Sequence, residues 1–151
     1  MSEVVWRFLA FEALTNRQLY AVLQLRSQVF VVEQACLFLD MDDRDAQAMH
    51  VLGMRQGRLL AYARCFAPGL AGPEAGLGRV LTHPSARGGG LGHALVREAI
   101  ARMARQWGAQ DIRIGAQAHL SAFYRQHGFE EAGPLYLEDG IPHLDMLRSV
   151  G

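Results

Sequence analysis

The stretch from Leu77 to Gly92, LGRVLTHPSARGGGLG, constrains the fold of this chain more than any other. An aliphatic run from Leu77 to Thr82 predicts a strand that stops before Pro84. The loop from Arg87 to Gly92 is mostly glycine, and a helical pattern begins at Leu91. Strand, glycine-rich loop and helix in this order direct backbone N–H groups and a helix N-terminus toward an anion. The stretch therefore predicts an anion-binding site within an α/β fold.

Length and composition narrow the class of protein. The 151 residues fit a single domain over residues 1–151. Fifteen basic residues, all arginine, balance fifteen acidic ones, which argues against nucleic acid or an anionic membrane as a partner. No apolar run reaches the roughly 18 residues of a membrane span, so we expect a cytoplasmic protein. Cys36 and Cys65 form no CxxC pattern, and we expect no metal site.

Hydrophobic periodicity predicts a mixed sheet with helices on both faces. A first helix is expected after the N-cap Thr15, with Arg26 off its apolar stripe and an end or irregular segment at Val29 to Glu33. Two further helices are expected over Leu91 to Trp107 and His119 to His127. Strands are expected over Val4–Phe11, His50–Arg55, Arg58–Phe66, Leu77–Thr82, Ile112–Gln117, Phe129–Ala132 and His143–Val150.

The glycine loop does not match the common nucleotide motifs. No Lys-Ser/Thr pair follows it, as a Walker loop requires, and its glycine spacing differs from that of a dinucleotide fingerprint. The alternative for the loop taken by itself is a flexible surface turn, and the flanking strand and helix favour the anion site. About thirty residues on, a second pattern, Phe-Tyr-x-x-x-Gly-Phe, ends the short helix that carries Tyr124. Tyr124 alone is as compatible with a core residue as with a catalytic one.

Taken together, these two patterns resemble the GNAT superfamily of acetyl-CoA-dependent N-acetyltransferases. The order of elements agrees over most of the chain. Three further strings resemble the ElaA-like branch of that superfamily. They are Arg26 with VFVVEQ at Val29–Gln34, GAQAH at Gly115–His119, and EDGIPH at Glu138–His143. The resemblance implies a GNAT fold, whose mixed sheet is partly splayed at the strand Ile112–Gln117.

The resemblance also implies where acetyl-CoA binds. The pyrophosphate would lie on the N–H groups of Gly88, Gly89, Gly90, Leu91 and Gly92, beside Arg87. The pantetheine arm would pair like an added strand with the main chain of Val80, Leu81 and Thr82. Many relatives have an asparagine seven residues before the tyrosine, where this chain has Gln117, which weakens the expectation that Gln117 binds the arm.

The chemistry needs an acid and a base. The resemblance implies that Tyr124 protonates the departing thiolate, and a backbone N–H near Leu81 is suited to the developing oxyanion. The base is open between Glu33, His119, Glu138 and His143. Glu33 follows two valines, and burial there would raise its pKa into a useful range. The alternative for Glu33 is an exposed charge at the helix end, and for His119 a structural or capping role is favoured over that of a base.

The acceptor side is less defined. Gln34, Arg79, Glu138 and His143 are expected around the acceptor, with Arg79 either in the cleft or paired with acidic residues. A solvated hairpin tip is the alternative for Glu138 and His143. The acidic stretch Asp40–Asp45 lacks the glycine and closing glutamate of an EF-hand. We expect it to be a solvated loop that attracts a cationic acceptor.

The sequence therefore predicts direct acetyl transfer from acetyl-CoA to a primary amine of a small molecule or peptide. A homodimer is left open. One alternative is a non-catalytic acyl-CoA-binding or regulatory module, which would not need Tyr124. Another is an enzyme like the acyl-homoserine-lactone synthases, which share a related fold but generally lack a good acyl-CoA loop such as Arg87 to Gly92.

Overall fold

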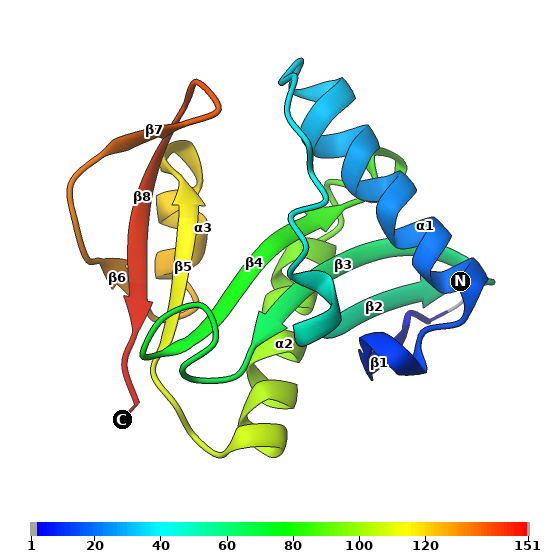
Figure 1. Ribbon diagram of the computed structural model, residues 1–151, viewed down its shortest axis with the longest axis horizontal. Coiled ribbons are helices and arrows are strands. Elements are labelled where there is room, and N and C mark those ends of the chain that lie inside the picture. Colours follow the sequence, from blue (N-terminus) through cyan, green and yellow to red (C-terminus); the bar gives the residue numbers. More distant parts are fainter. Residues whose placement is uncertain (1–2, 151) are drawn as a thin grey trace.

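The fold is that of a computed structural model, which describes residues 3–150. The strands of this range form one mixed sheet in the order β1-β2-β3-β4-β5-β8-β6, with β7 paired to β8 (Figure 1). The strands are β1 (Val5–Ala10), β2 (Met49–Arg55), β3 (Arg58–Phe66), β4 (Ala75–Thr82), β5 (Ile112–Gln117), β6 (Phe129–Glu131), β7 (Tyr136–Glu138) and β8 (Ile141–Arg148). The longer helices are α1 (Asn16–Arg26), α2 (Leu91–Trp107) and α3 (Ser121–Arg125), and the π-helical segment η2 (Ser27–Glu33) continues α1.

The sheet splits between β4 and β5, and this split creates the site. The two parallel strands pair only where Ala75–Leu77 meets Ile112–Ile114. Beyond that point β4 stays with β3 and β5 stays with β8, so the strands diverge toward Thr82 and Gln117 (Figure 1). The predicted partly splayed mixed sheet is confirmed. The facing backbone groups of the diverging halves have no ladder partners across the gap, which leaves them available to an extended ligand.

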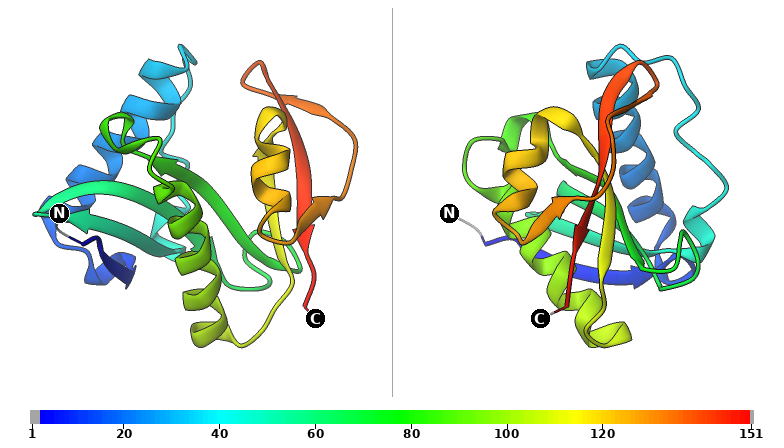
Figure 2. Two further views of the ribbon diagram at one scale, coloured as in Figure 1. Left: turned by 180° about the vertical axis from the view of Figure 1, so that it is seen from behind. Right: turned by 90° about the vertical axis from the view of Figure 1, so that its left-hand side faces the viewer.

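Helices cover both faces of the sheet, as predicted. Val22 and Leu25 of α1 and Val29 of η2 bury an apolar stripe against β2, β3 and β4 on one face. On the other face α2 buries Leu95 and Ala99 in the main core, and α3 lies beside it (Figure 2). Thr15 caps α1 in a capping box with Gln18, as expected for this N-cap. Among residues 3–150, no helix is long and apolar enough to cross a membrane.

Two hairpins end in the same kind of turn. Gln56-Gly57 joins β2 to β3 with φ of 51° and 77°, as expected for a two-residue type I′ turn. Asp139-Gly140 joins β7 to β8 with φ of 52° and 77°. The sequence prediction missed β7 and assigned the whole of Glu138–His143 to a turn. The strand predicted from His143 is confirmed but begins earlier, at Ile141, and Glu138 belongs to β7, so that His143 pairs with Tyr136.

The segment before Gly128 is also more broken than predicted. The expected helix from His119 to His127 consists of a 3-10 turn, η5 (Ala118–Leu120), followed by the short α3. Of the two alternatives for Val29–Glu33, the irregular segment is the one observed, because the first helix continues as the π-helical η2 to Glu33. A π-helical segment shifts side chains around the helix axis, and such segments often lie at functional sites. Here it extends the first helix to the mouth of the split sheet.

Candidate active site

A cavity of about 820 Å³ fills the split between β4 and β5. Gly78–Thr82 of β4 form one wall, and Ile114–Gln117 of β5 form the opposite one. The β7–β8 hairpin and the end of η2 enclose it further. The sequence-predicted site residues that line it are Glu33, Gln34, Arg79, Val80, Leu81, Thr82, Arg87, Gln117, His119, Tyr124, Glu138 and His143. Residues from six separate segments of the sequence therefore meet in one cavity.

The glycine loop lies beyond the mouth of this cavity. Gly88, Gly89 and Gly90 are exposed, and Gly88 and Gly90 have φ of 91° and 80°, which favour glycine. Gly90 is the N-cap of α2 and provides no side-chain cap. The first N–H groups of α2, from Leu91 and Gly92 onward, are therefore left for an anion outside the cavity. This geometry fits the predicted pyrophosphate cradle.

Arg87 forms a two-pronged ion pair with Glu33 at the cavity mouth. Its Nη1 and Nη2 donate to the Glu33 carboxylate at 2.9 and 2.7 Å. The expected burial of Glu33 is wrong, because Val32 and Glu33 lie on the solvent side of η2. The hydrogen bond from Arg87 lowers the pKa of Glu33 instead of raising it. A carboxylate with a lowered pKa is a weaker base, so the physical reason for choosing Glu33 is lost.

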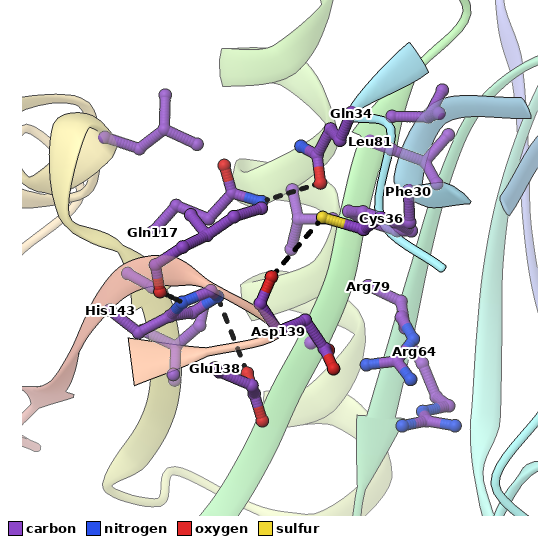
Figure 3. A pocket seen from close by; sticks show the side chains of 18 of the residues that line it. Phe30, Gln34, Cys36, Arg64, Arg79, Leu81, Gln117, Glu138, Asp139 and His143 are labelled. Atoms are coloured by element: carbon purple, nitrogen blue, oxygen red, sulfur yellow. Dashed lines mark hydrogen bonds and ion pairs between the residues drawn. The ribbon is translucent and has the colours of Figure 1, made fainter. Parts of the chain in front are cut away.

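Two contacts cross the cavity. The Gln117 Nε2 donates to Gln34 Oε1 at 3.3 Å, joining β5 to the chain after η2. The Cys36 thiol lies 3.5 Å from the backbone oxygen of Asp139, at the tip of the β7–β8 hairpin (Figure 3). Gln117 and Gln34 therefore lie together, as a direct pair across the split.

Tyr124 is placed as a buried group facing the cavity. It is only 4% exposed and packs edge-on against Phe123 and Phe129. Within residues 3–150 its hydroxyl has no hydrogen-bond partner, although Tyr124 lines the cavity. Burial raises the pKa of Tyr124, so the phenol keeps its proton at neutral pH. A buried, protonated hydroxyl without a protein partner is suited to donating a proton to a bound group.

Of the two histidines within residues 3–150 that line the cavity, His143 is the buried one. It is 8% exposed and stacks on Tyr136, so it is not part of a solvated hairpin tip. Its Nδ1 donates to the backbone oxygen of Ile141 at 2.7 Å, because a carbonyl can only accept. In the neutral ring Nε2 then carries the lone pair, and it lies 3.5 Å from Glu138 Oε2 (Figure 3). Such a ring can take up a proton, and Glu138 would stabilise the resulting imidazolium. His119, by contrast, is exposed at the cavity rim.

Three carboxylates of the acidic loop before β2 are paired with arginines and are not free in solvent, which corrects our expectation; only Asp43 among its aspartates is exposed. Asp40 is only 4% exposed, and its carboxylate accepts from Arg26 at 2.7 Å and from Arg79 at 2.9 Å. Asp45 accepts from Arg26 at 2.7 Å and from Arg64 at 3.0 Å. Each of these carboxylates therefore joins two arginines from different elements. We call these residues, together with Asp42, the arginine–aspartate network.

Asp42 completes the network. It accepts two hydrogen bonds from Arg64, both at 2.8 Å. Burial disfavours its charge, but the hydrogen bonds and charge of Arg64 outweigh burial and lower the pKa of Asp42 to about 2. Arg79 reaches the network from a β-bulge in β4, where its φ is 50° and Arg79 and Val80 together face Ala63 of β3. The network fixes the acidic loop to β3 and β4.

Sequence reasoning missed the role of two arginines. Arg26, expected off the apolar stripe, is fully buried, and Arg64 is 5% exposed. Arg64 lies in the strand Arg58–Phe66, where every residue after the first is buried. A charge inside such an apolar strand is the signal that points to a buried ion pair. The aspartates of the acidic loop are the carboxylates that pair with Arg64.

Comparisons with known proteins agree with this architecture. A family model for the acetyltransferase (GNAT) domain matches residues 16–150. The ElaA protein of Escherichia coli K12 is 38% identical over 97% of both chains, and the E. coli ElaA crystal structure superposes with a TM-score of 0.90, covering 97% of this chain and 99% of that one. The crystal structure of an acyl-CoA N-acyltransferase from Pseudomonas aeruginosa is 40% identical, with a TM-score of 0.93 over 97% of this chain and 100% of the other.

The acyl-homoserine-lactone synthase LasI shares only the fold. Its TM-score is 0.80 over 100% of this chain and 92% of its own, at 15% identity. The family match and the two close relatives go further than the fold, because they extend over nearly the whole sequence. The chain belongs to the GNAT acetyltransferase family, in its ElaA-like branch, and is a GNAT-type acyltransferase.

Proposed function

We propose that the protein transfers acetyl from acetyl-CoA directly to a primary amine of a small molecule or peptide. The observation that carries this proposal is that one cavity is lined by the open edge of β4, by Tyr124 and by His143. An acyl donor, an acid and a base are the three components that direct acyl transfer to an amine needs.

The residues on the donor side fit an acyl-CoA. Val80, Leu81 and Thr82 present the β4 edge that has no partner toward β5, and the α2 N-terminus offers free N–H groups at the mouth. Acetyl-CoA supplies an acyl group activated as a thioester. Arg87 would provide charge to the pyrophosphate once it leaves Glu33. These groups bind and orient the donor, which is positioning work.

His143 is our choice of base, with Tyr124 as the acid. His143 lines the cavity, and its Nδ1 bond to Ile141 leaves Nε2 on the side of Glu138, 3.5 Å from that carboxylate. The Nε2 atom would take the proton that the acceptor amine loses, and Glu138 would stabilise the charge. Tyr124 would give its proton to the leaving sulfur. Glu33 and His119, which are more exposed, would act at the mouth rather than as base.

A covalent route through Cys36 has no support in its surroundings. The thiol lies against the Asp139 carbonyl, and no histidine is hydrogen-bonded to it among the described residues. A thiol needs such a base or a cation to become a nucleophile. Direct transfer therefore suits the site better.

The test uses purified protein, acetyl-CoA and a panel of amines, with free thiol followed over time. We expect turnover with at least one amine and a loss in kcat on the order of 10²-fold in Tyr124→Phe. Longer acyl-CoA donors in the same assay measure the preference for acetyl. Tight CoA binding without turnover of any amine would favour the non-catalytic module. Full activity in Tyr124→Phe would reject the acid assignment.

A further inference from the structure

The two sides of the acceptor region carry opposite net charge. On the β4 side, the three aspartates of the arginine–aspartate network neutralise Arg26, Arg64 and Arg79. Arg44 lines the same wall and makes no ion pair within residues 3–150, so the side chains of this wall that line the cavity carry an excess of positive charge, while the neighbouring Asp43 lies outside the lining. Glu138 and Asp139 at the β7–β8 hairpin give the facing side an excess of negative charge. Figure 3 shows Arg64 and Arg79 on one side and Glu138 and His143 on the other.

Arg44 is held in position without being neutralised. Its Nη2 donates to the backbone oxygen of Leu70 at 3.2 Å, and its guanidinium lies 5.5 Å from the centre of the Phe66 ring. Arg64 lies over the same ring at 5.0 Å, and its buried Nε has no hydrogen-bond partner. Arginine donors therefore outnumber acceptors on this wall. A wall with surplus guanidinium donors is suited to a carboxylate.

The hairpin side is suited to a cation. The Glu138 side chain is 60% exposed, and its contact is His143 at 3.5 Å. The carboxylate of Asp139 has no partner within the described range 3–150, because Cys36 contacts only its backbone oxygen. An ammonium group arriving here would be attracted by two carboxylates and would lie beside the proposed base.

We propose that the acceptor is a small zwitterion of the amino acid type, with a primary amine and a carboxylate in one molecule. This inference rests on the proposed function and names its substrate class. The carboxylate lies against Arg44 beside Arg79, and the amine lies between Glu138 and His143. The step forms the bond between nitrogen and the acyl carbon and breaks the carbon–sulfur bond. His143 Nε2 receives the proton that converts the bound ammonium to the nucleophilic amine, the Tyr124 hydroxyl gives a proton to sulfur, and the second proton that the nitrogen loses restores the Tyr124 hydroxyl.

A purely cationic acceptor fits this charge distribution less well. We expected the acidic loop to attract such a molecule, but Asp40, Asp42 and Asp45 are occupied by arginines. The exposed Asp43 does not line the cavity. A polyamine that placed one amine at the hairpin would bring its other charges toward Arg44. Like charges in a partly enclosed cavity repel, so a polyamine would lose affinity there.

The test compares amino acids with their amides, which keep the amine and side chain but lack the negative charge. The panel includes α-amino acids, β-alanine, 4-aminobutyrate and each matching amide, with acetyl-CoA as donor. For the best acceptor we expect kcat/KM to be about tenfold or more higher for the acid than for the amide. Arg44→Gln should remove most of this preference by slowing the acid alone, and Arg44→Lys should keep part of it. Arg105→Gln, on the exposed side of α2, is the matched control.

A second variant separates the two ends of the substrate. Glu138→Gln should slow the acid and the amide alike, because both keep the amine. Equal rates for acid and amide in the wild type, or an unchanged preference in Arg44→Gln, would overturn the zwitterion proposal while turnover itself upholds the proposed function. If nothing turns over, calorimetry of the CoA-loaded protein decides. Arg44-dependent binding of the acid over the amide supports the site without the activity, and no such binding overturns it.

Discussion

The two walls of the cavity differ in how their charges are used. On the β4 wall, Arg26, Arg64 and Arg79 are bound to aspartates in a network that is largely buried. On the opposite wall, His143 of β8 and Tyr124 of α3 have few polar partners. Buried ion pairs hold the neighbouring elements in one arrangement. Side chains whose donor or acceptor atoms have no protein partner can instead exchange protons with a ligand. The wall with the most charged residues is therefore the one that stabilises the fold, whereas the proposed acid and base lie on the wall with fewer charges.

Removing the centre of the network should have the largest effect on stability. Arg26→Ala leaves Asp40 and Asp45 buried without a main partner, which costs about 3–5 kcal/mol of unfolding free energy. Urea denaturation measures the loss. Arg17→Ala, on the exposed side of the same helix, is the control and should change the free energy of unfolding by less than about 0.5 kcal/mol. Equal effects of the two variants would mean that the network does not stabilise this wall.

Substitution of His143 on the opposite wall should lower activity and leave stability nearly unchanged. His143→Gln should lower kcat on the order of 10²-fold while the folded protein stays nearly as stable, because the change removes a proton acceptor and little packing. Steady-state kinetics and urea denaturation on one preparation measure both quantities. A variant that unfolds easily but keeps its kcat would assign His143 to structure instead of catalysis.

The pH dependence of stability should come from the network wall. The pKa of Asp42 is about 2 in the folded protein, below its ordinary value of 3.8, so its contribution is present above about pH 4 and is lost as pH falls through 2. We expect a loss on the order of 2 kcal/mol from this carboxylate, and a shallower acid slope in Asp42→Asn. Chemical denaturation at a series of pH values measures the slope. The same slope in wild type and variant would contradict the assignment.

The smallest effect concerns the pair at the cavity mouth. Glu33→Gln releases Arg87 from an exposed ion pair, in which the Arg87 side chain is 43% exposed and the Glu33 side chain 38%. Exposed pairs are worth up to about 1 kcal/mol, so CoA should bind up to about fivefold more tightly. Calorimetric titration with CoA measures this, and Arg87→Gln should weaken binding. Weaker binding in Glu33→Gln would mean that Glu33 positions Arg87 for the cofactor.

Local sequence determined the donor half of the molecule. The run from Leu77 to Gly92 specifies strand, loop and helix through neighbouring residues, and α2 begins at Leu91 and ends at Trp107 as predicted. The Gln56-Gly57 turn and the Thr15 cap could also be predicted from the sequence, because hydrogen bonds and φ preferences within a few residues determine both. These features need no knowledge of distant partners.

Only the tertiary structure decided the acceptor half. Arg26 meets Asp40 across 14 residues, Arg64 meets Asp42 across 22, and Arg79 meets Asp40 across 39. Nothing local tells an arginine which aspartate will lie beside it, so the acidic loop looked solvated. Glu33 looked buried because its neighbours are apolar, yet η2 turns it to solvent toward Arg87. Burial and ion pairing depend on how elements pack, and packing is a property of the whole fold.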